Sequence, residues 1–449
     1  MQKTLFLKLL AIGGLTLILL IPLSMIRDVI SARQQRQLEV EQTVAASSAG
    51  HQLLVGPILA IPYVEKVVTK IFDDKTRETI TITDIDRLAL FMPETLNVES
   101  VASVGAKYKG LYKALVFENK GSWRARFAVP ANLGLDVDPK MIKTGRAYLA
   151  VGVSDVRGII GQPCLTWGAS RLAVAQGTRL APFPQGIHAE IGRLESKDAQ
   201  TYEAALDLSI IGTGTLSYVP IGSLMTVRLK SLWPHPNFTG RFLPREKSIT
   251  DSGFSARWET THFATANNEL IRRRTAFEMP GVPPTAQSNQ FDTFGTTFIE
   301  PVNVYLQAER AVKYGILFMA LTFAGFFLIE TLKQLRIHPL QYGLVGLSLA
   351  VFFLLVISLS EHLAFAWAYL IAASACISLL GYYLSHALKS RVRGLVFAAM
   401  FTLLYGVLYG LLLSEDNALV MGSLLLFASL AAIMVLTRKV DWYDLRTNS

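Results

Sequence analysis

The sequence predicts an α+β membrane protein with six transmembrane helices, one N-terminal and five C-terminal, and a large β-rich domain inserted between helices 1 and 2. Three observations lead to this fold class. Hydrophobic residues make up 51% of the 449 residues and charged residues only 17%, against about 25% in an ordinary soluble domain. Six apolar runs without Asp, Glu, Lys or Arg are long enough to cross a bilayer. The long insert after the first run alternates apolar and polar residues with the period of β-strands.

The six apolar runs mark the expected spans, because an apolar helix needs about 20 residues to cross a hydrocarbon core of ~30 Å. They cover residues 9–26, 314–329, 339–360, 363–388, 394–414 and 417–437. The first run follows Lys3 and Lys8, as the apolar stretch of a signal peptide would, but no small-x-small cleavage site stands where the run ends. We therefore expect an uncleaved anchor.

Loop charges predict the orientation, since short cytoplasmic loops are enriched in Lys and Arg. The loops after spans two and four and the C-terminal tail carry such residues, whereas the turns after spans three and five do not. We expect both termini in the cytoplasm and the insert outside, which in a bacterium is the periplasm. The expected organisation is an anchor at 1–27, a polar helical linker at 28–50, a β-rich periplasmic domain at 51–312, a five-helix bundle at 313–437 and a cytoplasmic tail at 438–449.

Strand patterns fill most of the insert. Residues 123–129 alternate between apolar residues and Arg124, Arg126 or Ala128, which is typical of a strand with one wet face. Further strands are expected at 79–91, 147–153, 204–211, 225–229 and 298–306. Because Gly, Pro, Asn and Asp separate these runs, we expect a sandwich or multi-sheet architecture.

Several function classes lack their sequence signals. The two cysteines, Cys164 and Cys376, lie in the insert and in a span and cannot pair, and no CxxC or HExxH motif marks a metal site. No nucleophile motif such as GxSxG is present, and the glycine turn at 212–214 lacks the rest of a phosphate loop. We expect no catalytic residue, cofactor or metal, and hence no enzyme. The positive charge of the insert is mild for its length and no nucleic-acid-binding motif occurs, so no nucleic acid partner is expected.

The segment Trp233-Pro234-His235-Pro236, followed by Phe238, is a candidate interaction site. Prolines on both sides of a histidine fix the backbone and remove two N–H donors, so the rings would form a rigid docking patch. In a second interpretation Trp233 and Phe238 are core anchors at a sheet corner, because large aromatic residues are more often buried than exposed. The sequence leaves both interpretations open.

Three ionisable residues near the spans are candidates for coupling. Glu330 lies at the end of the second span. In a functional interpretation it is a proton or ion site. In a structural interpretation its side chain snorkels to the interface or pairs with Lys333. Glu361 and His362 lie in a short outer turn. In a functional interpretation they shuttle protons, because histidine titrates near neutral pH. In a structural interpretation they end a helix and solvate the loop. In each case the structural interpretation is favoured over the functional one.

A GxxxG motif, Gly406 with Gly410, predicts a close helix contact in the fifth span. Such a motif also fits contact between two copies of the chain. A homo-oligomer through these glycines is therefore one expected partner, beside the lipid bilayer itself.

Several long strings are distributed over the whole chain. They include Leu54-Val55-Gly56-Pro57, Trp233-Pro234-His235-Pro236, Ser252-Gly253-Phe254 with Trp258, His338-Pro339 with Gln341-Tyr342, Ser360-Glu361-His362 and Asp441-Trp442-Tyr443. In these strings the sequence resembles the CreD-type family of inner-membrane proteins, and the resemblance runs from end to end. The resemblance implies a cell inner-membrane protein with a large periplasmic domain that maintains envelope integrity. It also implies synthesis under a two-component system in an envelope-stress and β-lactam response, and it implies no enzyme mechanism.

Two functions follow as expectations. In the first, the periplasmic domain binds an envelope component, which is a protein, peptidoglycan or a glycolipid. In the alternative, the chain is a transporter or lipid-handling protein with the domain as lid or receiver, and polar coupling between Glu330 and the Glu361–His362 turn would support it. Spans three to six contain almost no ionisable group and no interior proline, which makes a polar pathway through one chain hard to build. An envelope enzyme of unknown type is a third, unsupported alternative.

Overall fold

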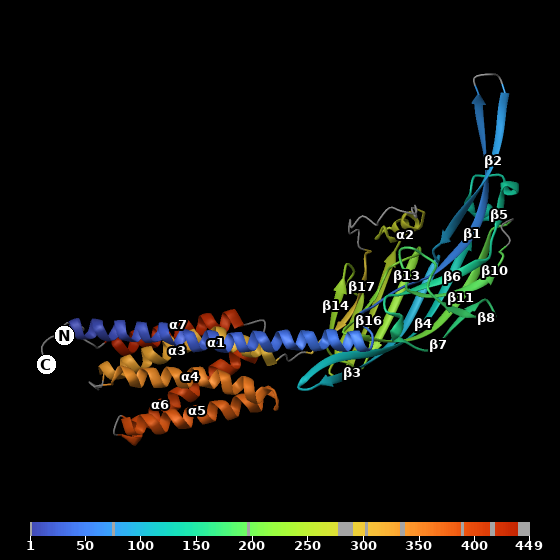
Figure 1. The fold of residues 1–449 in the computed structure, drawn as a ribbon. Coiled ribbons are helices and arrows are strands. Elements are labelled where there is room, and N and C mark those ends of the chain that lie inside the picture. The colour runs from blue at the N-terminus through green and yellow to red at the C-terminus, as the bar shows by residue number, and fades with distance from the viewer. Residues whose placement is uncertain are drawn as a thin grey trace. The chain divides into compact units, whose positions relative to one another are not determined.

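The computed structural model describes residues 2–73, 77–194, 198–276, 291–300, 304–332, 337–387, 390–413 and 418–438. The chain divides into two compact units: a β unit, Gln37–Pro301, and a helical unit that combines Met1–Arg36 with Val302–Ser449. The predicted fold class is confirmed, since a large β-rich insert follows an N-terminal helix and precedes a set of apolar helices (Figure 1).

One sheet of the β unit has nine strands in the order β14-β17-β12-β1-β6-β10-β9, with β2 and β5 also paired to β1. Its strands are β1 (Gln52–Asp73), β2 (Arg77–Phe91), β5 (Ile142–Thr144), β6 (Ala147–Val153), β9 (Val174–Gln176), β10 (Gly186–Gly192), β12 (Thr215–Tyr218), β14 (Pro236–Gly240) and β17 (Phe294–Phe298). β1 and β2 pair from Leu59 with Phe91 to Asp73 with Arg77, which makes a long hairpin that extends beyond the rest of the sheet (Figure 1).

The other sheet has eight strands in the order β15-β16-β13-β3-β4-β11-β7-β8. They are β3 (Thr95–Lys109), β4 (Tyr112–Val129), β7 (Ile159–Trp167), β8 (Ser170–Leu172), β11 (Gln200–Thr213), β13 (Leu224–Ser231), β15 (Glu246–Thr250) and β16 (Gly253–Thr261). β3 and β4 pair as far as Lys109 with Tyr112, whereas β13 leaves β3 at Ala102. The end of the β3–β4 hairpin therefore projects beyond β13. The connections hold helix α2 (Asn267–Ala276) and the short 3-10 turns η1 (Ala131–Gly134), η2 (Pro139–Met141) and η3 (Val156–Gly158).

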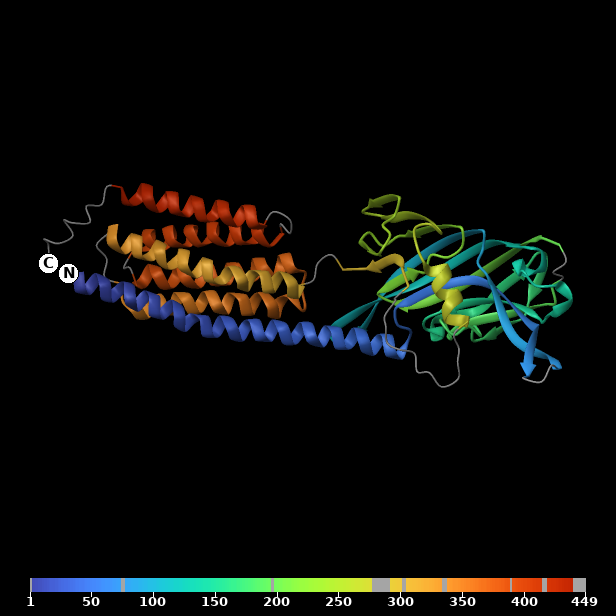
Figure 2. The same ribbon diagram turned by 90° about the horizontal axis from the view of Figure 1, so that it is seen from above.

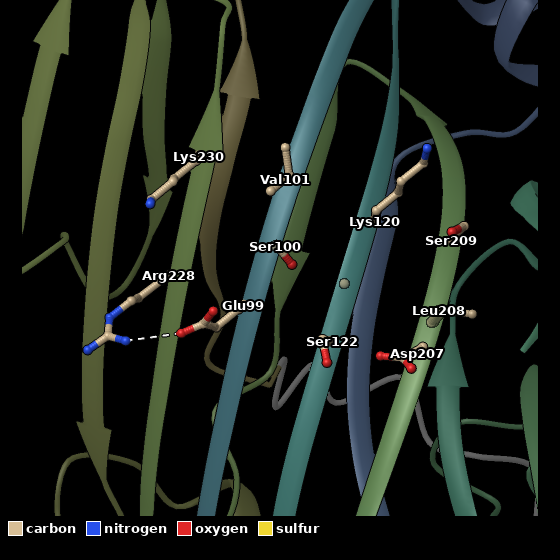
Figure 3. A pocket seen from close by; sticks show the side chains of 11 residues that line it. Glu99, Ser100, Val101, Lys120, Ser122, Asp207, Leu208, Ser209, Arg228 and Lys230 are labelled. Atoms are coloured by element: carbon tan, nitrogen blue, oxygen red, sulfur yellow. Dashed lines mark hydrogen bonds and ion pairs between the residues drawn. The ribbon is translucent and has the colours of Figure 1, made fainter. Parts of the chain in front are cut away.

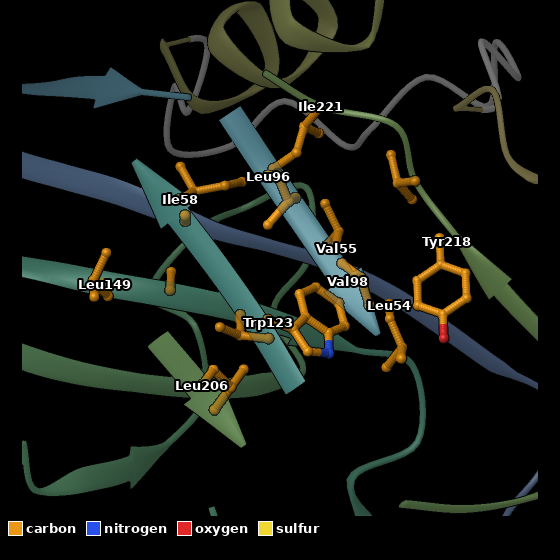
Figure 4. Close-up of a cluster of buried hydrophobic side chains, with 14 of the residues drawn as sticks. Leu54, Val55, Ile58, Leu96, Val98, Trp123, Leu149, Leu206, Tyr218 and Ile221 are labelled. Carbon is orange, nitrogen blue, oxygen red and sulfur yellow. The ribbon is translucent and has the colours of Figure 1, made fainter. Parts of the chain in front are cut away.

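The two sheets pack face to face over one hydrophobic core (Figure 4). The ring of Trp123 in β4 lies 6.0 Å from that of Tyr218 in β12, and Trp258 in β16 lies 5.6 Å from Phe294 in β17. Both tryptophans are only 1% exposed. Burial of large apolar side chains stabilises a fold by roughly 1.5–3 kcal/mol each, so these contacts between sheets are a principal source of stability.

A small polar cluster lies within this core. The Tyr218 hydroxyl and the Ser100 Oγ are 2.8 Å apart, and Asn119 Nδ2 lies 3.5 Å from the same Oγ. Burial raises the pKa of Tyr218 to about 12, so the hydroxyl remains neutral at physiological pH. Because Ser100 is in β3 and Tyr218 in β12, their hydrogen bond joins the two sheets.

Helix α1 (Gln2–Ser47) ends inside the β unit. Its Val40 and Val44 pack on Ala114 and Val116 of β4. These contacts cover one end of the outer face of the eight-stranded sheet. The polar residues expected to form a linker are therefore part of a continuous helix that packs on the domain.

A polar clamp fixes the chain directly after α1. The Asp155 carboxylate accepts the Gly50 N–H at 3.0 Å and lies 2.6 Å from the Arg157 guanidinium, which also donates to the Ala46 carbonyl. The hydrogen bond from Arg157 outweighs partial burial and, with backbone N–H groups, lowers the pKa of Asp155 from 3.8 to about 2. The clamp is therefore charged at any physiological pH.

The helical unit contains α3 (Val304–Leu332), α4 (Pro339–Ser360), α5 (Phe365–Ala387), α6 (Arg391–Leu413) and α7 (Ala418–Thr437), which run alongside one another (Figure 2). Among the described residues, five helices are long and apolar enough to cross a membrane: Leu10–Ser47, Tyr305–Leu328, Pro339–Ser360, Phe365–Ala387 and Arg391–Leu413. The segment Val420–Val435 is a shorter apolar helix. Glycine permits close packing in this unit, because a Cβ at Gly346 of α4 would overlap Leu19 of α1.

The predicted strand at 298–306 is wrong. β17 ends at Phe298, and α3 begins at Val304, well before the expected span start at residue 314. Pro301 has no N–H with which to extend a ladder. Beyond it, Tyr305, Ala308 and Val312 recur at helical spacing and are buried. The other expected strands lie within β2, β4, β6, β11 and β13.

Candidate functional site

Trp233 and His235 hold the point where the chain leaves the β unit. The Trp233 Nε1–H donates to the Ile299 carbonyl at 2.9 Å, and the Ile299 N–H donates to the His235 carbonyl at 3.2 Å. The two rings meet edge-on with centroids 6.2 Å apart. The next residue, Glu300, forms an ion pair with Lys113 of β4. This segment thus fixes the end of the domain from which α3 continues.

Phe238 lies in β14 with its ring directed into the core. It packs edge-on against Phe254 at 5.8 Å and Trp258 at 5.6 Å. Trp233 is half-buried and also packs on the core. The aromatic rings therefore sit as the second interpretation describes, and a docking role for the half-buried His235 ring stays a prediction.

Glu330 is buried in the helical unit, with 5% of its surface exposed. Its carboxylate accepts the Ile337 N–H at 3.1 Å and the Tyr342 O–H at 2.9 Å. The side chain turns inward rather than snorkelling, and it bonds the start of α4 across the connection from α3. The expected partner Lys333 lies outside the described residues.

Glu361 and His362 point to different surroundings. Glu361 caps the end of α4 and lies 3.3 Å from the Arg33 guanidinium of α1, with 9% of its side chain exposed. His362 is exposed, and its N–H donates to the Leu359 carbonyl at 3.0 Å. Glu330 and Glu361 interact with opposite ends of α4, whose 22 residues span ~33 Å. The structure does not bring these candidates into one site.

The GxxxG pair has unequal surroundings. A Cβ at Gly406 would meet no atom within 4 Å, whereas one at Gly410 would lie 3.3 Å from Met421 Cε of α7. Gly410 thus serves packing inside the helical unit, and Gly406 leaves open space beside α6.

A shallow depression of about 690 Å³ lies on the outer face of the eight-stranded sheet (Figure 3). Polar side chains of four adjacent strands define what we call the polar face: Asn97 and Glu99 of β3, Lys120, Ser122 and Arg124 of β4, Asp207 and Ser209 of β11, and Arg228 and Lys230 of β13. Arg228 donates to Glu99 at 3.1 Å. Within the described part of the chain, Arg124, Lys230 and Asp207 have no charged partner.

The polar face places separate positive and negative groups on a rigid support. Lys230 and Arg124 supply donors, and Asp207 supplies an acceptor. Ser122 of β4 lies between Lys230 of β13 and Asp207 of β11, and Ser209 adds a hydroxyl group on β11 (Figure 3). Such an array suits a ligand that carries both carboxylate and amine or hydroxyl groups. It contains no nucleophile paired with a base, and no cluster of three or more His, Cys, Asp or Glu that could hold a metal occurs within the described ranges.

The sequence pattern contained a signal for this face without locating a site. Alternation at 123–129 predicts one wet face, and Arg124 is part of it. The neighbouring charges come from β13 and β11, which no local pattern connects to β4.

Comparison with known proteins identifies the family. The chain matches the family described as Inner membrane protein CreD over residues 4–443. The chain belongs to the CreD family. It is 36% identical over 443 residues to Inner membrane protein CreD of Escherichia coli K12, across 99% of this chain and 95% of that protein. With its several apolar helices, it is a multi-pass inner-membrane protein.

A comparison with solved structures adds nothing to this assignment. An M1 zinc metallopeptidase from Deinococcus radiodurans aligns at 9% identity over 38% of each chain, with a TM-score of 0.19. A score this low carries no argument about fold or function. The CreD family and the geometry above are therefore the basis for assigning a role.

Proposed function

We propose that this CreD-family protein maintains cell-envelope integrity by binding an envelope component on the polar face, without catalysing a reaction. The observation that supports the proposal is the polar face on the eight-stranded sheet, where, among the described residues, Arg124, Lys230 and Asp207 have no charged partner beside the Arg228–Glu99 ion pair. The loop charges support a periplasmic β unit with both termini in the cytoplasm. The resemblance supports synthesis in an envelope-stress and β-lactam response under two-component control.

The partner is a protein, peptidoglycan or a glycolipid. Mixed charge at close spacing favours a partner that is itself zwitterionic, such as a peptide or the peptide stem of peptidoglycan. A strongly anionic partner would meet Glu99 and Asp207 within the same depression, at a cost from like charges.

Charge reversal tests the proposal in cells. A strain lacking the protein is complemented with Arg124→Glu combined with Lys230→Glu, and resistance to a β-lactam and to detergent is measured at equal protein level. We expect resistance to fall to that of the uncomplemented strain. The matched control is Arg272→Glu on α2, an exposed position outside the polar face that should leave resistance unchanged. Full resistance of the double variant would contradict the proposal.

A transport or lipid-handling role is the second candidate, and buried Glu330 is the observation that favours it. Its contacts to Ile337 and Tyr342 also fit a structural carboxylate. Replacing Glu330, Glu361 and His362 with uncharged residues distinguishes an ion-coupled role of these groups from a structural one. Unchanged resistance at equal protein level would exclude ion coupling through these groups.

We also propose that two copies can meet through the open space at Gly406. Gly406→Leu should then abolish a crosslinked dimer, whereas Gly422→Leu, at another glycine with open space, should not. A monomer in both wild type and variants would contradict this contact.

A further inference from the structure

The tip of the β3–β4 hairpin, residues 106–113, exposes large side chains to solvent. Tyr108 is 70% exposed and Leu111 is 52% exposed. Gly110 makes the turn between them with φ of 64°. Isolated exposed hydrophobic residues are common on protein surfaces, but two at the end of a projecting hairpin form a compact apolar tip.

The same tip is strongly basic. Its sequence is Ala-Lys-Tyr-Lys-Gly-Leu-Tyr-Lys, with Lys107, Lys109 and Lys113 and no acidic residue. Lys109 is exposed, and Lys107 makes a long contact of 3.4 Å with the Ser48 hydroxyl. Tyrosine, leucine and lysine together are the residue types that gather where proteins meet the headgroup region of a bilayer.

The base of the hairpin is held firmly. Val40 and Val44 of α1 pack on its Ala114 and Val116, so the hairpin is more than a free two-stranded ribbon. At the start of β4, Lys113 pairs with Glu300. The chain from Glu300 to Tyr305, where the next apolar helix begins, can span at most about 17 Å. A short covalent connection therefore joins the residue that pairs with Lys113 to the start of α3.

The same end of the β unit carries further exposed apolar residues. Leu232 is 85% exposed and precedes Trp233, which binds the Ile299 carbonyl, and Ile299 itself is 41% exposed. The β3–β4 hairpin continues beyond this end of β13, and it extends further than β11, whose pairing with β4 ends at Thr213 and Val116. Apolar exposure and positive charge thus coincide at the end from which the chain leaves the β unit.

We propose that the hairpin tip binds the surface of the membrane that anchors the chain, with Tyr108 and Leu111 in the interface and Lys107 and Lys109 on anionic phospholipid headgroups. The occupant is the lipid surface because the tip combines positive charge with aromatic and apolar groups, and because a short covalent connection joins its ion-pair partner Glu300 to the apolar helix α3. This contact is separate from the polar face and from the ligand proposed there.

Depth-dependent quenching of a fluorophore tests the proposal on the full-length protein. A polarity-sensitive label is attached at Tyr108→Cys in a Cys164→Ser, Cys376→Ala background, and the protein is placed in nanodiscs of phosphatidylcholine alone or with phosphatidylglycerol. Lipids that carry a spin label near the headgroup act as quenchers. The matched control is Phe263→Cys, an 88% exposed site that follows β16 at the opposite end of the sheet.

We expect strong quenching at position 108, little at position 263, and an increase at 108 with phosphatidylglycerol. Each lysine near an anionic surface contributes about fivefold to binding, so Lys107→Gln with Lys109→Gln should lower the bound-to-free ratio by about 30-fold. Equal quenching at 108 and 263 would overturn the proposal. A shifted emission at position 108 without lipid quenching would indicate a protein contact and would also overturn the proposal. Quenching that depends neither on phosphatidylglycerol nor on Lys107 and Lys109 would overturn it as well. Because this test measures lipid quenching and not envelope resistance, it can contradict the membrane contact without contradicting the proposed binding on the polar face.

Discussion

Gly158→Ala should destabilise the β unit at the junction with α1. Gly158 ends η3, and a Cβ at this position would overlap the Ile211 carbonyl oxygen and the Nε2 of Gln52. That nitrogen donates to the carbonyls of Asp155 at 3.0 Å and Ile211 at 2.9 Å, and Gln52 is only 1% exposed. The methyl group therefore displaces a buried amide and strains the backbone beside the Asp155–Arg157 clamp.

The magnitude follows from two effects. Overpacking of a rigid site costs about 1–3 kcal/mol, and loss of two buried hydrogen bonds costs about 1 kcal/mol each. We expect the free energy of unfolding to fall by roughly 3–5 kcal/mol. For a unit of this size, that corresponds to a drop in Tm of roughly 5–15 °C.

The assay is thermal unfolding of the purified full-length protein in detergent, followed by tryptophan fluorescence, since Trp123 and Trp258 report on the core of the β unit. The matched control is Gly105→Ala in β3, where a Cβ would meet no atom within 4 Å. The control should leave Tm unchanged or raise it slightly, because alanine reduces the entropy of the unfolded chain. Equal Tm values for the two variants would refute the reasoning.

Three further predictions concern single side chains, each measured by the same unfolding assay. Trp233→Phe removes the 2.9 Å hydrogen bond to the Ile299 carbonyl and should lower the free energy of unfolding by about 1 kcal/mol. An unchanged Tm would contradict a stabilising role for this hydrogen bond. Tyr218→Phe leaves Ser100 without its 2.8 Å partner and should cost about 1–2 kcal/mol, unlike Tyr108→Phe at an exposed site. Asp155→Asn should destabilise at neutral pH. Because the folded pKa of Asp155 is lowered from 3.8 to about 2, the advantage of the wild type should persist down to about pH 4 and vanish as the pH falls through 2. An advantage that disappears between pH 7 and 5 would contradict this assignment.

The elements that could be predicted from the sequence are those with a local periodic signal. Strand β6 coincides with the expected 147–153, and β4 contains the alternation at 123–129, because burial of every second residue is visible within one strand. Uncharged runs similarly revealed the apolar helices. The prediction of a strand at 298–306 was wrong because so short a mixture of apolar and polar residues fits both the strand period and the helix period. Only the structure shows that a helix begins at Val304.

Side-chain partners across the fold could not be predicted. Glu330 stands at the edge of an apolar run, and its inward turn depends on Tyr342, 12 residues further along the chain. Glu361 pairs with Arg33 in the N-terminal helix, a contact that no spacing rule indicates. The polar face depends on β13 lying beside β3, which brings Arg228 to Glu99 across 129 residues. Sheet order, and therefore such a surface, is a property of the tertiary fold.

Photocrosslinking in living cells tests most directly whether the polar face binds an envelope component. A photoreactive amino acid replaces Ser122, at the centre of the polar face, and in a second strain Gln176, an exposed residue of β9 in the other sheet. Mass spectrometry identifies every adduct. We predict a discrete protein, peptidoglycan or glycolipid adduct from position 122 that is absent from position 176 and is lost with Arg124→Glu and Lys230→Glu. No adduct at 122, or the same adducts from both positions, would contradict the account.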